Sequence, residues 1–116
     1  MTTLAQVRPA QFDQWLEQCR AQGVTPLVLD VREPWECATA SITPDGFELV
    51  RIPMQEIPAR QQELDFERPV ACLCHHGMRS MHVGMFLLNQ GFEQVTNITG
   101  GIDAWSRERD PQVPLY

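Results

Sequence analysis

The sequence predicts an α/β fold in which helices cover both faces of a parallel β-sheet, and three observations favour it. Apolar, strand-like segments alternate with helix-like segments along the chain of 116 residues. The segments 27–31 and 70–74 are apolar almost without interruption, which is typical of strands that are buried on both faces. The chain has the length of one globular unit and contains no linker or repeat, so we expect residues 1–116 to form a single domain.

The first half of the chain supplies three of the predicted strands. Its elements are, in order, an edge strand at 4–7, a helix introduced by Pro9 and closed by Gly23, a strand at 27–31, a short helix from Pro34 to Ala38, and a strand at 47–52 after a turn at 44–46. The first helix carries apolar residues at i, i+3, i+4 and i+7, which are Phe12, Trp15, Leu16 and Cys19. Cys19 therefore falls on the buried stripe of this helix.

The second half continues the same alternation. Its elements are, in order, a helix candidate at 54–64 that Pro58 can divide into shorter turns, a strand at 70–74, a helix that carries Val83, Phe86, Leu87 and Gln90 along one side and stops at Gly91, a strand at 95–98, and a terminal helix at 102–105 after Gly100-Gly101. We expect Trp105 to anchor the terminal helix by packing.

The charge of the chain limits the partners to be expected. There are 15 acidic and 9 basic residues, a net charge of −6, which argues against binding to nucleic acid. All the basic residues are arginine, so a Schiff-base lysine is excluded. An anionic substrate must therefore be attracted by local groups.

The cysteines and the amino terminus indicate the compartment. Four cysteines in a chain of this length do not form a disulfide framework, and reduced thiols suit the cytoplasm. The first residues do not combine a basic region with an apolar run, so we expect no signal peptide, and no segment has the length of a membrane span. These observations predict a cytoplasmic protein without membrane contact.

The chemistry of the chain concentrates after the strand at 70–74. Cys74 ends this strand, a short loop with Gly77 follows, and a helix begins near Arg79. The carboxyl end of a strand is where α/β folds place their ligands, and loop N–H groups with a helix amino terminus favour an anion. The same groups favour a thiolate over a thiol, as a nucleophilic cysteine requires.

Three segments resemble the rhodanese family of sulfurtransferases, in the right order and spacing. They are Leu29-Asp30-Val31-Arg32-Glu33-Pro34-Trp35-Glu36, Cys74-His75-His76-Gly77-Met78-Arg79-Ser80, and Gly91-Phe92 with Val95 and Gly100-Gly101-Ile102-Asp103-Ala104-Trp105. Together they extend over residues 27–105. One departure is Ala40-Ser41-Ile42, where the family commonly has glycine-histidine-isoleucine, and the connection from Thr43 to Glu48 is longer.

The resemblance implies a three-layer rhodanese-like domain with a five-stranded parallel sheet in the order 3-2-4-5-1. It also implies that Cys74 carries a sulfane sulfur as a persulfide, taken from a donor such as thiosulfate and passed to cyanide or a thiol, which can belong to an acceptor protein. Neither a cofactor nor a metal is expected. The residues expected to bind substrate are His75, His76, Gly77, Met78 and Arg79, and those expected to support the loop are Asp30, Arg32 and Ser80.

The residue types suggest how the loop works. Arg79 would hold an anionic donor and stabilise the departing charge, and Gly77 suits a tight turn with inward N–H groups. We expect His75 and His76 to project from the loop rather than to act as bases, and Cys72 to be inert core. Asp30 is expected to fix the loops through hydrogen bonds with Arg32.

Three other interpretations compete with sulfur transfer. A zinc site of Cys72, Cys74, His75 and His76 would place four ligands within five residues, which is strained for tetrahedral geometry. Cysteine-based phosphatases have five residues between cysteine and arginine, whereas four separate Cys74 from Arg79. Non-catalytic rhodanese-like binding modules typically lack the cysteine. The physiological donor, the acceptor and the oligomeric state stay open.

Overall fold

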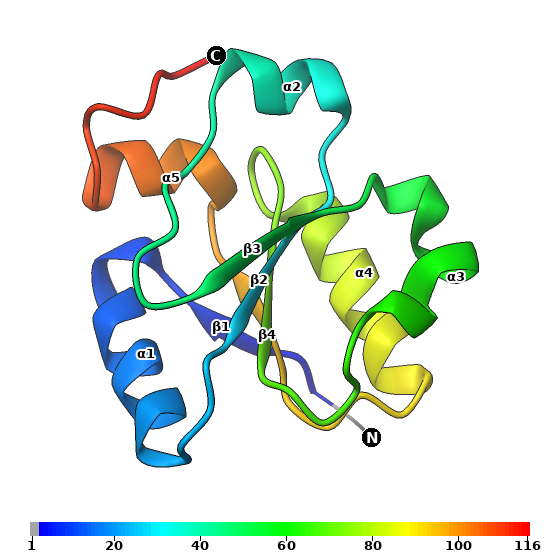
Figure 1. Cartoon of the computed structure of the whole chain (residues 1–116). Coiled ribbons are helices and arrows are strands. Elements are labelled where there is room, and N and C mark those ends of the chain that lie inside the picture. Colours follow the sequence, from blue (N-terminus) through cyan, green and yellow to red (C-terminus); the bar gives the residue numbers. More distant parts are fainter. Residues whose placement is uncertain (1–2) are drawn as a thin grey trace.

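Five parallel strands form the centre of the computed structural model, which describes residues 3–116 (Figure 1). The strands are β1 (Ala5–Val7), β2 (Leu27–Asp30), β3 (Glu48–Arg51), β4 (Val70–Leu73) and β5 (Val95–Ile98). Their order across the sheet is β1-β5-β4-β2-β3, and every neighbouring pair is parallel. The predicted order 3-2-4-5-1 describes the same arrangement from the other edge and is confirmed.

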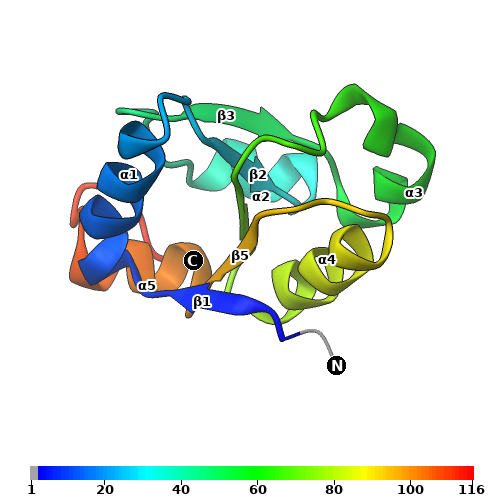
Figure 2. The same cartoon turned by 90° about the horizontal axis from the view of Figure 1, so that it is seen from below.

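Helices pack on both faces of this sheet, as Figure 2 shows. They are α1 (Phe12–Ala21), α2 (Pro34–Thr39), α3 (Ile57–Arg60), α4 (Met78–Asn89) and α5 (Gly101–Glu108), with short 3₁₀ turns η1 (Pro9–Gln11), η2 (Met54–Glu56) and η3 (Gln61–Glu63). Helices α1 and α5 lie on one side, α3 and α4 lie on the other, and α2 lies near the carboxyl ends of the strands (Figure 1). The predicted three-layer architecture is therefore correct.

The two faces of the sheet bury separate apolar clusters, because alternate residues of a strand point to opposite sides. Leu27 and Leu29 of β2 belong to the cluster under α3 and α4, whereas Val28 belongs to the cluster under α1 and α5. In the second cluster Trp105 is 3% exposed and its ring centroid lies 4.9 Å from that of Phe12. Trp105 thus anchors α5 by packing, as predicted.

Two helical segments show how far the sequence prediction reached. The helix candidate at 54–64, which Pro58 was expected to be able to divide into shorter turns, is divided into η2, α3 and η3, since Pro58 cannot donate a backbone hydrogen bond within a longer helix. The terminal helix extends beyond Trp105 to Glu108. An ion pair of Arg107 with Asp103 at i, i+4 supports the additional turn on the exposed side, where apolar periodicity gives no signal.

The predicted site residues lie together at the carboxyl-terminal edge of the sheet. Asp30 is the last residue of β2, Cys74 follows β4 directly, and β5 leads through Gly100 into α5. Because β2, β4 and β5 are parallel neighbours, these segments meet beside α2 at the top of Figure 1. Within residues 3–116, none of the helices combines the length and the apolar character needed to cross a membrane.

Candidate active site

Cys74 lies at the start of the loop between β4 and α4, and its sulfur is held by this loop. The residue is 1% exposed. The backbone N–H of Gly77 donates a hydrogen bond to the Sγ of Cys74 at 3.0 Å, and the Ser80 Oγ lies 3.3 Å from the same sulfur. A backbone donor aimed at sulfur is the arrangement that stabilises negative charge there.

Gly77 makes the turn that aims this donor. Its φ of 105° lies in the left-handed region, which residues with a side chain rarely adopt. Gly77 also caps the amino terminus of α4, a helix of 12 residues, so its positive end faces the loop. The sequence motif and the geometry therefore agree on why a glycine stands three residues after the cysteine.

Helix α5 holds the same loop from the opposite side. The N–H of Ile102 donates to the carbonyl of Cys74 at 2.8 Å, and the N–H of Asp103 donates to the carbonyl of His75 at 3.1 Å. In a trans peptide the carbonyl and the following N–H point in opposite directions. The two peptide groups thus direct their carbonyls at α5 and their N–H groups, those of His75 and His76, away from it.

Ser80 is held by Asn97, which is hydrogen-bonded in turn to Gln6, and neither Asn97 nor Gln6 was among the predicted site residues. Its hydroxyl donates to the Asn97 Oδ1 at 2.6 Å, and the Nδ2 of Asn97 donates to the carbonyl of Gly77 at 3.2 Å and to the Gln6 Oε1 at 3.0 Å. Asn97 is 3% exposed, in strand β5. An asparagine within a short strand between Val95 and Ile98 is the signal in the sequence that could have indicated this role.

Asp30 and Arg32 form a fully buried ion pair on the other side of the site. Arg32 donates to the two carboxylate oxygens of Asp30, from Nε at 2.9 Å and from Nη2 at 2.7 Å. Other donors of Arg32 reach the carbonyls of Glu36 and Ala40. The bonds between Arg32 and Asp30 are those expected from the sequence, and Arg32 also ties the middle and the C-cap of α2 to the carboxyl end of β2.

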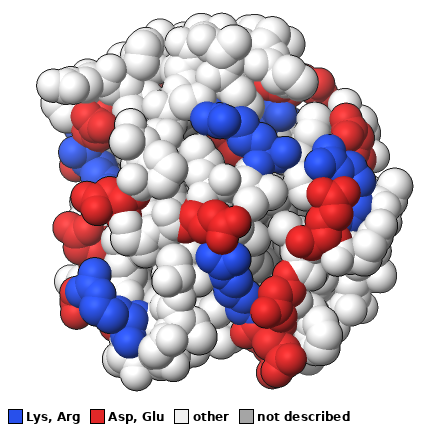
Figure 3. All heavy atoms as spheres, viewed as in Figure 1, with Lys and Arg blue, Asp and Glu red and all other residues white. Residues whose placement is uncertain are grey.

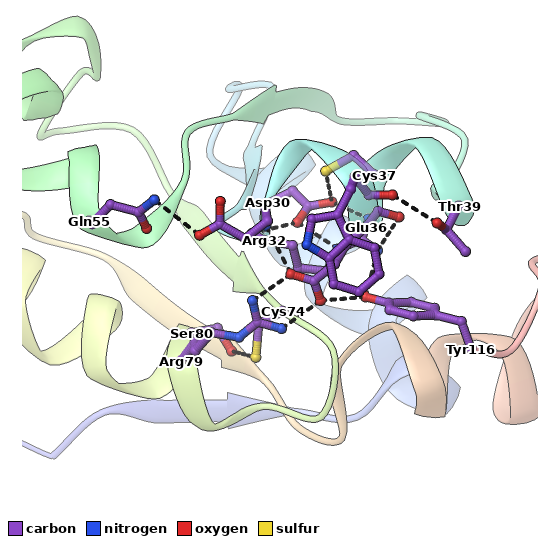
Figure 4. Close-up of polar contacts among 12 residues, drawn as sticks. Asp30, Arg32, Glu36, Cys37, Thr39, Gln55, Cys74, Arg79, Ser80 and Tyr116 are labelled. Atoms are coloured by element: carbon purple, nitrogen blue, oxygen red, sulfur yellow. Dashed lines mark hydrogen bonds and ion pairs between the residues drawn. The ribbon is translucent and has the colours of Figure 1, made fainter.

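Arg79 does not stand alone beside Cys74, because its guanidinium is paired with Glu36 (Figure 4). Nη1 and Nη2 of Arg79 donate to the two carboxylate oxygens of Glu36 at 2.7 and 2.8 Å. The hydroxyl of Tyr116 donates to the same carboxylate at 2.9 Å and accepts from Arg32 at 3.0 Å. Glu36 and Tyr116 were not among the predicted site residues.

The charges in this network are strongly coupled. The pKa of Glu36 is lowered to about 2, mainly by the hydrogen bonds from Arg79. The hydrogen bonds from the backbone N–H of Glu33 and from the Tyr116 hydroxyl lower this pKa further. The hydrogen bonds between Arg79 and Glu36 raise the pKa of Arg79. Burial raises the pKa of Tyr116 to about 12. At neutral pH the site thus contains an ionised Glu36 and Arg79 beside a neutral Tyr116.

The two histidines occupy different positions. His75 is half-buried, with its ring stacked between those of His76 and Tyr116 at centroid distances of 3.9 Å on each side. Burial is the main cause that lowers the pKa of His75, and its buried Nε2 has no hydrogen-bond partner among the described residues. His76 projects into solvent, as does Met78, which is 61% exposed. Met78 therefore lies at the surface beside the loop.

His75 and His76 also lie near Asp103, and the three ligand atoms are within 4.8 Å of one another. The imidazole planes are stacked at 26°, so their lone pairs, which lie in the ring planes, do not converge on one point. Asp103 is also engaged by Arg107. The arrangement does not fit a shared ion, and Cys72 and Cys74 are not part of this group.

Cys72 and Cys37 lie outside the reactive part of the site. Cys72 is fully buried in β4, and burial raises the pKa of its thiol to about 12, which suits an inert core residue. Cys37 is half-buried on α2, with its sulfur 3.7 Å from the Asp30 Oδ2. Burial also raises the pKa of Cys37.

The segment that departs from the family pattern is built into the structure. The carbonyl of Ala40 accepts a hydrogen bond from Arg32 at 2.9 Å, and Ile42 is 3% exposed in the core under α1 and α5. Ser41 caps α2 by donating to the carbonyl of Cys37. The departure therefore leaves the active loop untouched.

Fold and site together define a class of protein, an α/β domain with a cysteine in an amide-bearing loop at the carboxyl edge of a parallel sheet. The Rhodanese-like domain family matches residues 8–108. The chain belongs to the rhodanese-like domain family, and the resemblance of the three motifs is confirmed.

Individual relatives agree with this assignment. A protein of Allochromatium vinosum named Sulfurtransferase is 39% identical over 98 residues, which are 84% of this chain and 88% of that protein. Rhodanese-like/PpiC domain-containing protein 12, chloroplastic, of Arabidopsis thaliana is 41% identical over 93 residues, but this chain spans only 30% of its length. The crystal structure of a rhodanese-related protein from Thermoplasma volcanium is similar with a TM-score of 0.75 and 28% identity, covering 97% of this chain and 99% of that chain.

The contact between the loop and α5 predicts a strong effect of Gly101→Ala. A Cβ at Gly101 would overlap the carbonyl oxygens of Cys74 and His75, and φ is +61°. We expect a loss of at least about 3 kcal/mol in the free energy of unfolding, measured by urea denaturation. Gly91→Ala is the matched control, since φ is +98° there but nothing lies within 4 Å of the added Cβ, so about 1 kcal/mol is expected. Equal losses in the two variants would contradict the contact.

The coupling of Glu36 to Arg79 predicts a loss of stability in acid. The folded pKa of Glu36 lies near 2, below its ordinary value of 4.5, so its contribution is complete above pH 4.5 and disappears as the pH falls toward 2. The difference corresponds to about 3 kcal/mol. Denaturant unfolding at several pH values should show this decline, and Glu36→Gln should flatten it. An identical decline in the variant would assign the acid sensitivity to other groups.

Proposed function

We propose that this protein is a sulfurtransferase that moves a sulfane sulfur from a donor such as thiosulfate to a thiophilic acceptor, cyanide or a thiol, through a persulfide on Cys74. The observation that carries the proposal is that the sulfur of Cys74 lies 3.0 Å from the backbone nitrogen of Gly77, in the loop that leads into the amino terminus of α4. The name of the A. vinosum relative, Sulfurtransferase, supports the same chemistry.

In the proposed first step the thiolate of Cys74 attacks the outer sulfur of thiosulfate. A bond forms between Sγ and this sulfur, the S–S bond within thiosulfate breaks, and sulfite leaves with the bonding electron pair. The loop N–H groups and the helix terminus stabilise the negative charge on the persulfide that results. Ser80 lies 3.3 Å from Sγ, within reach of the charged sulfur.

In the second step the acceptor attacks the outer sulfur of the persulfide. With cyanide, a C–S bond forms, the S–S bond to Sγ breaks, and thiocyanate leaves while Cys74 returns to the thiolate. A thiol acceptor takes the sulfur in the same way and becomes a persulfide itself. The cycle consumes no cofactor, because the electron pair with which Cys74 forms the S–S bond returns to Sγ when that bond breaks, and the other electron pair leaves with sulfite.

A phosphatase activity is the alternative enzyme, and the pairing of Arg79 weighs against it. An arginine that binds phosphate supplies a full positive charge and two parallel N–H groups, and in this site the charge of Arg79 and its Nη1/Nη2 pair are already engaged by Glu36. The loop is also one residue shorter than that of cysteine-based phosphatases. A binding module without chemistry is disfavoured by the placement of Cys74 beside the Gly77 N–H.

The proposal predicts that Cys74→Ser removes thiocyanate formation from thiosulfate and cyanide down to the uncatalysed rate, because a serine hydroxyl does not replace a thiolate nucleophile. Cys72→Ala is the control, and its activity should stay close to that of the unmodified chain because Cys72 is fully buried. Hydrolysis of an aryl phosphate is measured in parallel. Efficient hydrolysis without sulfur transfer would overturn the proposal, as would full transfer by Cys74→Ser.

A further inference from the structure

We infer that Glu36 is a specificity-determining residue that makes the site favour sulfur donors with a single negative charge over the dianion thiosulfate. The inference rests on the proposed function and names the donor class for the same site. The class consists of organic thiosulfonates, in which an alkyl or aryl group replaces one charged oxygen of thiosulfate. The sulfane sulfur that Cys74 attacks is the same in both kinds of donor.

The loop contains one arginine, Arg79, and Glu36 neutralises its charge. Arg79 is the only arginine between residues 74 and 80, and its two terminal nitrogens face the two oxygens of Glu36 at 2.7 and 2.8 Å. The Glu36 side chain is 5% exposed, so water screens the pair weakly from that side. An incoming anion therefore meets an ion pair rather than a free guanidinium.

Two further hydrogen bonds hold the carboxylate of Glu36 beside Arg79. Its Oε2 accepts the backbone N–H of Glu33 at 3.0 Å, closing the capping box of α2. Its Oε1 accepts the hydroxyl of Tyr116, which Arg32 holds in turn. Releasing Arg79 by moving the carboxylate would break these bonds, so the ion pair is the resting state of the site.

Arg32 and His75, which lie nearby, do not replace the attraction that a free Arg79 would exert on an anionic donor. Arg32 is neutralised by Asp30 at 2.7 Å, and Asp103 adjoins Arg107 at 3.0 Å. The pKa of His75 is lowered, which leaves its ring neutral. Figure 3 shows acidic and basic side chains lying next to one another over much of the face in view, and the chain carries a net charge of −6. The attraction that remains comes mainly from loop N–H groups and the end of α4, which correspond to about half a charge.

The charge of the site determines which sulfur donor it binds best. A half charge and a neutral ion pair suit one negative charge better than two, because the second charge loses its hydration without gaining a cation. An organic substituent also finds apolar partners, since Met78 is 61% exposed next to the loop and Trp35 is 64% exposed against Tyr116. The donor favoured by the site is therefore a monoanion with an apolar group.

The reaction of such a donor balances in the same way as that of thiosulfate. The thiolate of Cys74 attacks the terminal sulfur, the bond between Sγ and this sulfur forms, and the bond from it to the sulfonyl sulfur breaks. The organic sulfinate leaves with the electron pair, where thiosulfate would release sulfite. Less negative charge collects on the leaving group, so a neutralised Arg79 is sufficient.

The test compares methanethiosulfonate with thiosulfate as donors, with cyanide as acceptor, in the unmodified chain and in Glu36→Gln. Glutamine keeps the shape of Glu36 and removes its charge, which frees the charge of Arg79. We expect the KM for thiosulfate to fall roughly tenfold in Glu36→Gln and the KM for methanethiosulfonate to change much less. Added salt should reduce the gain for thiosulfate, since a more exposed charge is screened.

Glu33→Gln is the matched control. It removes one negative charge from the N-cap of α2, where the side chain is hydrogen-bonded to Gln55 and to the backbone N–H of Glu36 rather than to Arg79, and glutamine keeps an oxygen for that N–H. Its KM values for the two donors should stay close to those of the unmodified chain. The urea midpoint of each variant, measured first, shows that the proteins compared are folded.

The outcomes separate the inference from the function on which it rests. If Glu36→Gln leaves the ratio of the two KM values unchanged, or if Glu33→Gln shifts it equally, Glu36 does not determine the donor. If Glu36→Gln does not fold, the unmodified chain decides, because a KM for thiosulfate below that for methanethiosulfonate overturns the inference. If neither donor places sulfur on Cys74 in the unmodified chain, the proposed function itself is wrong.

Discussion

The two hydrogen bonds from α5 to the carbonyls of Cys74 and His75 are the constraint on which the active loop depends. A loop that presents N–H groups to an anion must direct its carbonyls elsewhere, and buried carbonyls need partners of their own. The first turn of a helix has N–H groups without intrahelical acceptors, so α5 and the loop satisfy each other. This contact requires the close approach at Gly101, where a side chain would overlap both carbonyls.

The opposite side of the site is built from paired charges, of which Asp30, Arg32 and Glu36 are buried and Arg79 is half-buried. Asp30, Arg32, Tyr116, Glu36 and Arg79 form one chain of hydrogen bonds that joins β2, α2, α4 and the segment after α5 (Figure 4). Buried ion pairs add little net stability compared with apolar packing, but removing one member leaves an uncompensated charge. Their clearer consequence is positional, because α2 and Arg79 are held in one arrangement relative to Cys74.

The sequence was sufficient for the elements and for the centre of the site. Continuous apolar runs identified β2 and β4, and a glycine three residues after Cys74 identified the loop, since both signals are local in the chain. The order of the strands came from the family resemblance rather than from the pattern of residues.

The partners of the loop could not be predicted, because they are distant in sequence. Glu36 stands 43 positions from Arg79 and Tyr116 stands 80 positions from Glu36, so no spacing rule connects them. Glu36 alone is read as the third residue of a helix, where a glutamate is common for capping. Only the fold shows that its carboxylate also neutralises the arginine of the active loop.

In the proposed function Cys74, and not Cys72 two residues before it, carries the transferred sulfur. Mass spectrometry with fragmentation of the peptide that contains both cysteines locates the sulfur, after exposure to a sulfane-sulfur donor without acceptor and again after addition of cyanide. We expect Cys74 to gain the mass of one sulfur atom and to lose it with cyanide, while Cys72 and the peptide containing Cys37 stay unchanged. An unmodified Cys74, or sulfur that is found only on another cysteine, would show that Cys74 is not the carrier.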